Sequence, residues 1–168
     1  DLDGIFAPEG GKNMAPRQHM RKMKVGKITF NEAYKAVSEY RRKFPQKAVT
    51  FYAQNYPSMG WAVFMASGSC PVIPCKDKAF LKDAAAMEVE ETNTDQYKKL
   101  VKSDTGNIIY SKSGTEIPIH LSSGKYVLKY IHPNSGEVNT INKSLKIKGL
   151  YTLKVPDKKE GIYWFHKL

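Results

Sequence analysis

The sequence has few cysteines and no long apolar run. Its two cysteines, Cys70 and Cys75, are not spaced as CxxC and no second pair exists, so a zinc or thiol redox motif is not indicated. Two prolines extend the segment between them, which disfavours a local disulfide, and we expect two buried free thiols. No apolar run approaches the ~20 residues that a transmembrane helix needs, so we expect no membrane span.

The signatures of several enzyme classes are also missing. The chain contains no glycine-rich phosphate loop, no HExxH, no GxSxG and no kinase signature. Its four histidines are not arranged with a metal-ligand spacing. We therefore predict neither a metal site nor a cofactor.

Arginine is scarce although the chain is basic. The formal net charge is +11, from 27 basic and 16 acidic side chains, and only four of the basic residues are arginines. Lysines are dispersed through nearly every segment, whereas phosphate readout favours clustered arginine. This distribution favours a solvated surface, and we expect no nucleic-acid partner. An anionic polymer as a partner is the alternative that the charge leaves open.

Residues 27–88 alternate between helical and extended patterns. Thr29 and Glu32 have the spacing of a capping box, apolar residues recur at helical spacing after them, and Pro45 ends the predicted helix. Residues 47–52 indicate a short strand, the apolar stretch from Pro57 to Gly68 a helix, and residues 77–87 a further helix. Such alternation is typical of an α/β layer.

The pattern changes to period two after a polar connecting segment, residues 89–104, which has a potential short helix at 94–101. Several short strands separated by turn residues indicate an antiparallel β-sandwich or a small barrel, and we predict the sandwich. The expected fold is therefore α+β, with an α/β segment over 1–104 and a sandwich over 105–168. The expected strands are Asn107–Ser111, Glu116–Leu121, Lys125–Ile131, Glu137–Asn142, Ser144–Lys148, Tyr151–Val155 and Ile162–His166.

Several strings resemble a known family. Asn55–Ser69 resembles the end of the barrel in glycoside hydrolases from gut bacteria. The closing part resembles the β-sandwich that follows such barrels, which has been described as a collagen-binding domain of a collagenase. The strings that carry this second resemblance are Ile109–Ser111, Val127–Glu137 and Gly161–Phe165.

The resemblance implies a role in carbohydrate degradation and a periplasmic, cell-surface or secreted location. A complete barrel needs roughly 250 residues, so we expect this chain to be a fragment or a truncated member without a complete catalytic site. A non-catalytic module that binds a glycan or a matrix protein is the alternative. The expected partner is a poly- or oligosaccharide, and self-association is a further expectation, because a truncated barrel would expose apolar surface.

Candidate site residues follow from this resemblance and from local context. Glu9 lies between an apolar residue and glycines, as a catalytic carboxylate at the end of a barrel strand would, or else it is a solvated loop residue. Asn55, Tyr56 and Trp61 lie where a predicted strand passes into a helix, which suits sugar binding, although the two aromatics would otherwise be core residues. Trp164 alternates with its neighbours and is either an exposed platform for a sugar ring or a buried core anchor.

Overall fold

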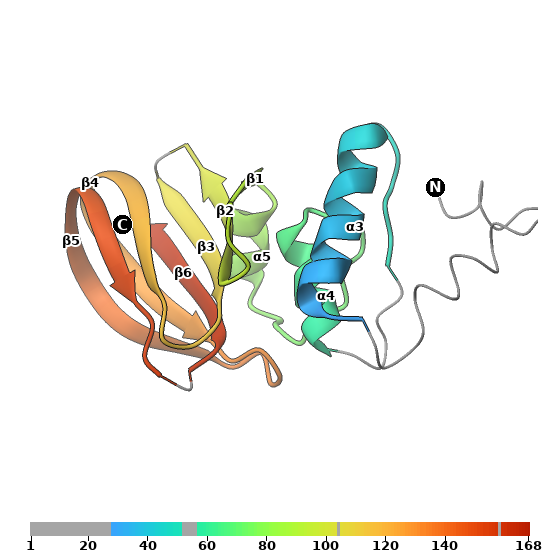
Figure 1. The fold of residues 1–168 in the computed structure, drawn as a ribbon. Coiled ribbons are helices and arrows are strands. Elements are labelled where there is room, and N and C mark those ends of the chain that lie inside the picture. Colours follow the sequence, from blue (N-terminus) through green and yellow to red (C-terminus); the bar gives the residue numbers. More distant parts are fainter. Residues whose placement is uncertain (1–27, 52–56, 104, 158) are drawn as a thin grey trace, which may run out of the picture. The chain divides into compact units, whose positions relative to one another are not determined.

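The computed structural model describes residues 28–51, 57–103, 105–157 and 159–168. The fold is α+β, with three helices and one six-stranded antiparallel sheet in this part of the chain (Figure 1). The chain divides into two compact units between Pro71 and Val72. The sequence predicted a division between residues 104 and 105 instead. The positions differ because one helix and two strands that precede residue 104 belong to the same unit as the rest of the sheet.

The first unit contains helices α3 (Phe30–Lys43) and α4 (Pro57–Met65). The predicted capping box is confirmed: the backbone N–H of Thr29 donates to Glu32 Oε2 at 2.7 Å, and that of Glu32 donates to Thr29 Oγ1 at 3.3 Å. The Thr29 N–H, and then the Thr29 hydroxyl, which donates to the same oxygen at 2.9 Å, hold the pKa of the Glu32 carboxyl below its ordinary value. The predicted helix after Pro57 is confirmed as well, and residues 59–66 are all buried, as expected for a helix that is apolar on every side.

The predicted strand at residues 47–52 is wrong for the part that the structure describes. Residues 48–51 belong to no strand. Val49 exchanges hydrogen bonds with Ser69 alone: its N–H donates to Ser69 Oγ at 3.1 Å, and its carbonyl accepts from the Ser69 N–H at 2.6 Å. A strand needs a continuous partner, and one residue does not supply it. The described residues therefore do not show the barrel-like layer that the alternating pattern predicted.

The second unit contains α5 (Lys78–Ala84) and the whole sheet. Its strands are β1 (Glu88–Glu90), β2 (Tyr97–Lys102), β3 (Gly106–Ser111), β4 (Glu116–Ile131), β5 (Val138–Lys154) and β6 (Gly161–Lys167). They pair in the order β1-β2-β3-β6-β4-β5. The helix predicted at 94–101 is wrong, because most of that segment is strand β2, which pairs with β3 along its length.

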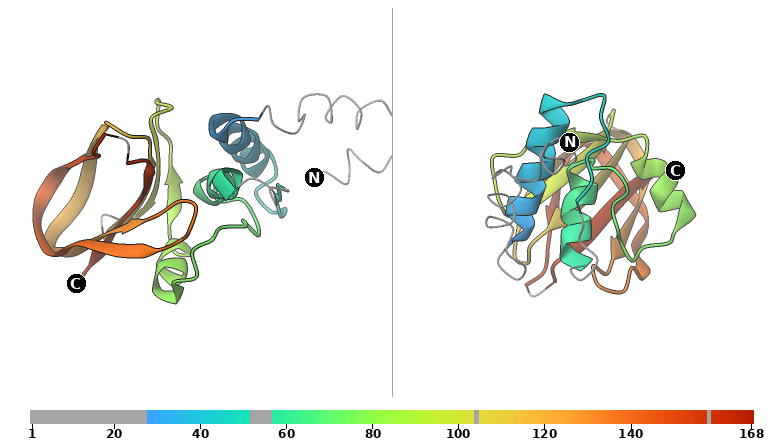
Figure 2. Two further views of the ribbon diagram at one scale, coloured as in Figure 1. Left: turned by 90° about the horizontal axis from the view of Figure 1, so that it is seen from below. Right: turned by 90° about the vertical axis from the view of Figure 1, so that its right-hand side faces the viewer.

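The long hairpin of β4 and β5 replaces five of the predicted strands. The residues Ser122–Gly124, expected as a turn, are instead a shift of register inside β4, and Gly149 lies inside β5. Bulges of this kind bend a strand without ending it. The first half of β4 pairs only with β5, whereas residues 126–131 also pair with β6. The hairpin therefore arches away from the other strands, as Figure 2 shows.

This curvature gives the sheet an inner and an outer face. Residues of both halves of β4 contribute to the core on the inner face, which also contains Ile109, Tyr163 and Phe165. The strands form a single curled sheet and not the two sheets of the predicted sandwich, because β4 and β5 run continuously through the bend. The predicted antiparallel pairing is confirmed.

Both cysteines are free, as expected, but only Cys75 is buried. Cys70 is exposed, so the prediction of two buried thiols is wrong for that residue. Burial raises the pKa of the Cys75 thiol. Within the described residues, no helix is long and apolar enough to cross a membrane.

Candidate functional site

The most connected polar group of the second unit is the carboxylate of Asp83, on α5. Asp77 caps this helix by accepting hydrogen bonds from the backbone N–H groups of Ala79 and Phe80. Phe80 and Asp83 are three residues apart and so lie on one side of the helix. Phe80 is fully buried, and its ring packs edge-on against the indole of Trp164 with 5.4 Å between the centroids. This packing holds Asp83 against the outer face of the sheet.

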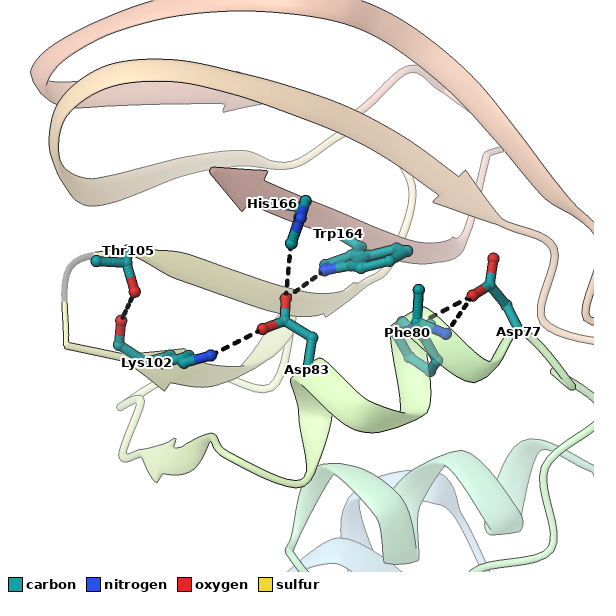
Figure 3. A network of polar contacts seen from close by, with 8 residues as sticks. Asp77, Phe80, Asp83, Lys102, Thr105, Trp164 and His166 are labelled. Atoms are coloured by element: carbon teal, nitrogen blue, oxygen red, sulfur yellow. Dashed lines mark hydrogen bonds and ion pairs between the residues drawn. The ribbon is translucent and has the colours of Figure 1, made fainter. Parts of the chain in front are cut away.

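Three side chains from two strands contact the Asp83 carboxylate (Figure 3). The indole Nε1 of Trp164 donates to Oδ2 at 2.8 Å, and His166 Nδ1 lies 3.4 Å from the same oxygen. Lys102 Nζ lies 3.3 Å from Oδ1. Trp164 and His166 reach the same side because they are two residues apart on β6. We call these four residues the Asp83 cluster.

The Asp83 cluster is buried at its centre and open at its rim. The Asp83 side chain is 10% exposed, while those of Lys102 and His166 are 43% and 50% exposed. A carboxylate in the last turn of a helix is opposed by the helix dipole. Lys102 offsets this repulsion, and the Trp164 N–H satisfies an acceptor that water cannot freely reach.

The chemistry available to the Asp83 cluster is limited. A carboxylate that orients an imidazole is one part of a general-base arrangement, which also needs a nucleophile beside the other ring nitrogen. Within the described residues, no side-chain hydroxyl hydrogen-bonds to His166, and no group of three or more His, Cys, Asp or Glu could hold a metal ion. The Asp83 cluster therefore joins α5 to the sheet and is not a complete catalytic site.

A second polar contact closes the curled sheet on its inner face. Lys99 of β2 is 6% exposed, and its Nζ lies 2.7 Å from Glu90 Oε1 and 3.0 Å from the carbonyl oxygen of Pro118. Pro118 lies in the first half of β4, which has no hydrogen-bonded neighbour strand on the side away from β5. Lys99 therefore provides a donor to a strand edge that would otherwise lack one.

A group of tyrosines surrounds the residues just before β6. The hydroxyl of Tyr110 donates to the Glu160 carboxylate, and the hydroxyl of Tyr130 donates to the Glu160 carbonyl at 3.0 Å. Burial, and then the neighbouring Glu160, raise the pKa of Tyr110 and of Tyr130. Burial and then Tyr130 raise the pKa of Tyr163 to about 12. All three phenols therefore stay neutral at ordinary pH and act as structural donors.

The structure places only two of the site residues that the sequence suggested. Glu9, Asn55 and Tyr56 lie outside the described residues. Trp61 is fully buried in α4, and Trp164 is 1% exposed. The burial of both tryptophans agrees with the alternative interpretation that they are core residues. Phe80 and the ammonium of Lys129, which lies 4.4 Å from the ring centroid, cover the indole of Trp164 and leave no free face for a sugar.

Sequence reasoning missed Asp83, Lys102 and His166. Asp83 carried one local signal, since an acidic residue in a helix's last turn is unfavourable unless a cation or donor is nearby. Nothing local indicated which cation this would be. Lys102 lies 19 residues from Asp83, and His166 lies 83 residues away.

Comparison with known proteins identifies a family. The family model described as a domain of unknown function, DUF6298, matches residues 1–87, which is more than half of the chain. The chain belongs to this family. The DUF6298 match includes α3, α4 and α5 and ends immediately before β1. The strands of the sheet follow the matched residues.

Solved structures give only distant likenesses. One, titled glycoside hydrolase, has a TM-score of 0.36 and 9% identity, and the alignment covers 49% of this chain and 20% of that one. Two CapF structures, one with the inhibitor 3-isopropenyl-tropolone and one described as a capsular polysaccharide assembling protein from Staphylococcus aureus, have TM-scores of 0.17 and 0.16 and identities of 10% and 11%. Those alignments cover 92% of this chain and 53% and 49% of the CapF chains.

The chain thus spans a fifth of the first of these structures and about half of the other two. At TM-scores this low, the likenesses assign neither a fold nor an activity to this chain. A search of the curated proteins finds no match.

Proposed function

We propose that this chain is the C-terminal portion of a glycoside hydrolase that acts in carbohydrate degradation, and that the chain by itself lacks a complete catalytic site. In this proposal the sheet is an accessory domain that follows the catalytic part. The proposed partner is a poly- or oligosaccharide, and the proposed location is the periplasm, the cell surface or the medium.

One observation carries the proposal. The three closing strings that resemble the domain following such barrels fall on β3, β6 and β4, which are hydrogen-bonded neighbours at the centre of the sheet. Their spacing along the chain is wide, but Ile109 pairs with Tyr163 and Tyr163 pairs with Tyr130. Ile109, Tyr130 and Tyr163 belong to one core, so the three strings form one structural unit, and this supports a resemblance that extends over the domain.

The contacts of three carboxylates in the second unit support the proposal that the catalytic site is incomplete. Glycoside hydrolysis needs two carboxyl groups ~5–9.5 Å apart on either side of the bond. Asp83, Glu90 and Glu160 instead contact neighbouring lysine, tryptophan or tyrosine side chains in contacts that hold the fold. The proposed catalytic carboxylate is Glu9, which lies outside the described residues and was chosen because it lies between an apolar residue and glycines.

An activity assay tests the proposal directly. The chain and its Glu9→Gln variant would be incubated with a panel of plant and host polysaccharides, and release of reducing ends would be measured alongside binding to the same glycans. We expect binding without turnover from this chain. Robust turnover that survives Glu9→Gln would contradict both the incomplete site and the role of Glu9. Absence of binding to every glycan would contradict the carbohydrate partner.

The alternative function is a binding module for a glycan or a matrix protein. Stacking on a sugar requires an exposed aromatic ring, and the exposed large apolar residues in the described part of the chain are all aliphatic. Trp164 and Tyr130 are both buried, so replacing either residue by alanine tests the stability of the sheet. A binding module built on this sheet would therefore use its polar and charged surface.

Self-association is a separate proposal. Val72, Leu81, Ile141 and Leu150 are large apolar side chains that are between 39% and 62% exposed. Sedimentation equilibrium at rising concentration would detect association, and a monomer mass at the highest concentration would contradict it.

A further inference from the structure

The hairpin of β4 and β5 carries a strong excess of positive charge. The two strands and the turn between them, residues 116–154, include six lysines and two acidic residues, Glu116 and Glu137, which gives a formal charge of 6 − 2 = +4. More than a third of the net charge of the chain therefore lies in this one hairpin. The excess arises because acidic residues are scarce in the hairpin, which holds six of the 23 lysines of the chain.

Three of these lysines lie together on the surface of the hairpin. Lys125 is the direct cross-strand partner of Lys146. Lys148 lies two residues beyond Lys146, on the same face of β5, because side chains alternate along a strand. All three are exposed, while Leu145 and Ile147, which alternate with the two lysines of β5, turn inward. We call Lys125, Lys146 and Lys148 the hairpin lysines.

Two of the other three lysines of this element have partners, while Lys143 is exposed like the hairpin lysines. Lys154 pairs with Glu116 at 3.1 Å, and Lys129 covers the ring of Trp164. No carboxylate within the described residues forms an ion pair with a hairpin lysine. Like charges directly opposite one another across two strands are destabilising. The hairpin therefore keeps an unfavourable arrangement that an anionic ligand would relieve.

We infer that the hairpin lysines bind an acidic polysaccharide, one that carries carboxylate or sulfate groups along an extended chain. This inference rests on the proposed function and narrows its substrate class from carbohydrates in general to polyanionic ones. Charge complementarity over a long, exposed edge strand suits a linear polyanion. Hydroxyl and amide side chains such as Asn142, Ser144 and Thr152 are exposed on the same strand and can bond sugar hydroxyls.

A nucleic acid fits this surface less well. Single-stranded nucleic acid is held by aromatic rings that stack on bases, and the exposed large apolar side chains of this hairpin are Ile141 and Leu150. Lysine is a compact point charge and attracts carboxylate or sulfate groups without requiring bidentate geometry.

The test compares two variants of equal charge. Lys125→Gln/Lys146→Gln/Lys148→Gln removes the hairpin lysines. Lys76→Gln/Lys78→Gln/Lys82→Gln removes three exposed lysines elsewhere in the same unit. Calorimetric titration with polygalacturonate and with chondroitin sulfate would be carried out at two salt concentrations, with neutral dextran and single-stranded DNA as further ligands.

We expect the parent chain to bind the acidic polysaccharides, with affinity that falls as salt rises. Three exposed ionic contacts correspond to a loss of about tenfold in affinity for the hairpin variant. The control variant should change affinity less than about twofold, because its lysines lie outside the contact. Unchanged thermal unfolding of both variants would show that the loss is not caused by unfolding.

Several results would overturn the inference. Equal losses in the two variants would mean that net charge alone attracts the polymer. Tighter binding of DNA than of either acidic polysaccharide would assign the surface to nucleic acid. Binding of neutral glycans that the hairpin variant leaves intact would remove the inference while the proposed function stands. No binding of any glycan by the parent would remove both, and the hairpin lysines would then serve only to keep the edge strand from pairing with other chains.

Discussion

Asp83 of α5 accepts a hydrogen bond of 2.8 Å from the indole of Trp164 on β6, although the two residues are 81 positions apart in the chain. This bond satisfies the indole N–H of a tryptophan that is only 1% exposed. It also fixes the position of α5 on the sheet. The consequences of breaking it can be measured.

Replacing Asp83 by alanine should destabilise the second unit by about 2–3 kcal/mol, because the buried indole N–H loses its acceptor. Asp83→Asn keeps an acceptor but loses the charge that Lys102 and His166 contact, and about 1 kcal/mol is expected. Urea unfolding followed by tryptophan fluorescence measures the free energy of unfolding of both variants. Glu116→Gln, in an exposed pair with Lys154, is the control and should cost under about 0.5 kcal/mol. Equal effects at the two positions would contradict the structural role of Asp83.

Replacing Lys99 by methionine should loosen the arch of the hairpin. The substitution keeps the volume of the buried stem but leaves the carbonyl of Pro118 without its donor, which costs about 1–3 kcal/mol. Hydrogen exchange should accelerate most in residues 116–121, the half of β4 that pairs only with β5. Lys76→Met, at an exposed position, is the control. Faster exchange spread evenly over the sheet would contradict a local role for Lys99.

Two glycines with positive φ allow the cost of backbone strain to be measured separately from the cost of a steric clash. Gly149 has φ +100° and open space around it, so Gly149→Ala should cost only the left-handed backbone penalty of about 1–2 kcal/mol. Gly136 has φ +72°, and an added Cβ would lie 2.4 Å from the carbonyl carbon of Pro74. Gly136→Ala should therefore cost at least about 1 kcal/mol more, because the backbone there must move. Similar melting temperatures for the two variants would show that the 72–75 segment does not pack on this turn.

Alkaline pH should destabilise the sheet. The pKa of Tyr163 is raised from 10.0 to about 12 in the folded chain, so the unfolded chain loses this proton first as pH rises. The stabilisation from the neutral phenol is complete below pH 10 and is lost as pH climbs from there to about 12. Unfolding midpoints measured across this range should fall, and should fall less steeply for Tyr163→Phe.

The Glu160→Gln variant provides a second test of the raised pKa values of the buried tyrosines. Glu160 contributes to the raised pKa of both Tyr110 and Tyr130, so its neutralisation should lower both values and shift tyrosinate absorbance to lower pH. Burial remains the larger cause, so the shift should be partial. An unchanged titration curve would contradict the contact between Glu160 and these tyrosines.

Local sequence determined the helices, because their signals act within a few residues. The capping box at Thr29 and Glu32 fixed the start of α3, and Asp77 capped α5 in the same way. Period-two alternation also identified the strand residues beyond 105 and placed Tyr163 and Trp164 on opposite faces of β6. Each of these features depends on backbone hydrogen bonds or side-chain spacing within one element.

Tertiary structure decided everything that depends on partners far along the chain. Residues 47–51 have strand-forming side chains but lack a strand to pair with, whereas the polar segment at 97–102 gained one in β3. Ser122–Gly124 reads as a turn, yet it lies within one strand because β5 continues to pair on both sides of it. The grouping of Asp83 with Trp164, and of Lys125 with Lys146, follows from sheet register, which no local pattern encodes. The energy of strand pairing depends on the neighbouring strand, and the tertiary structure determines which strand becomes the neighbour.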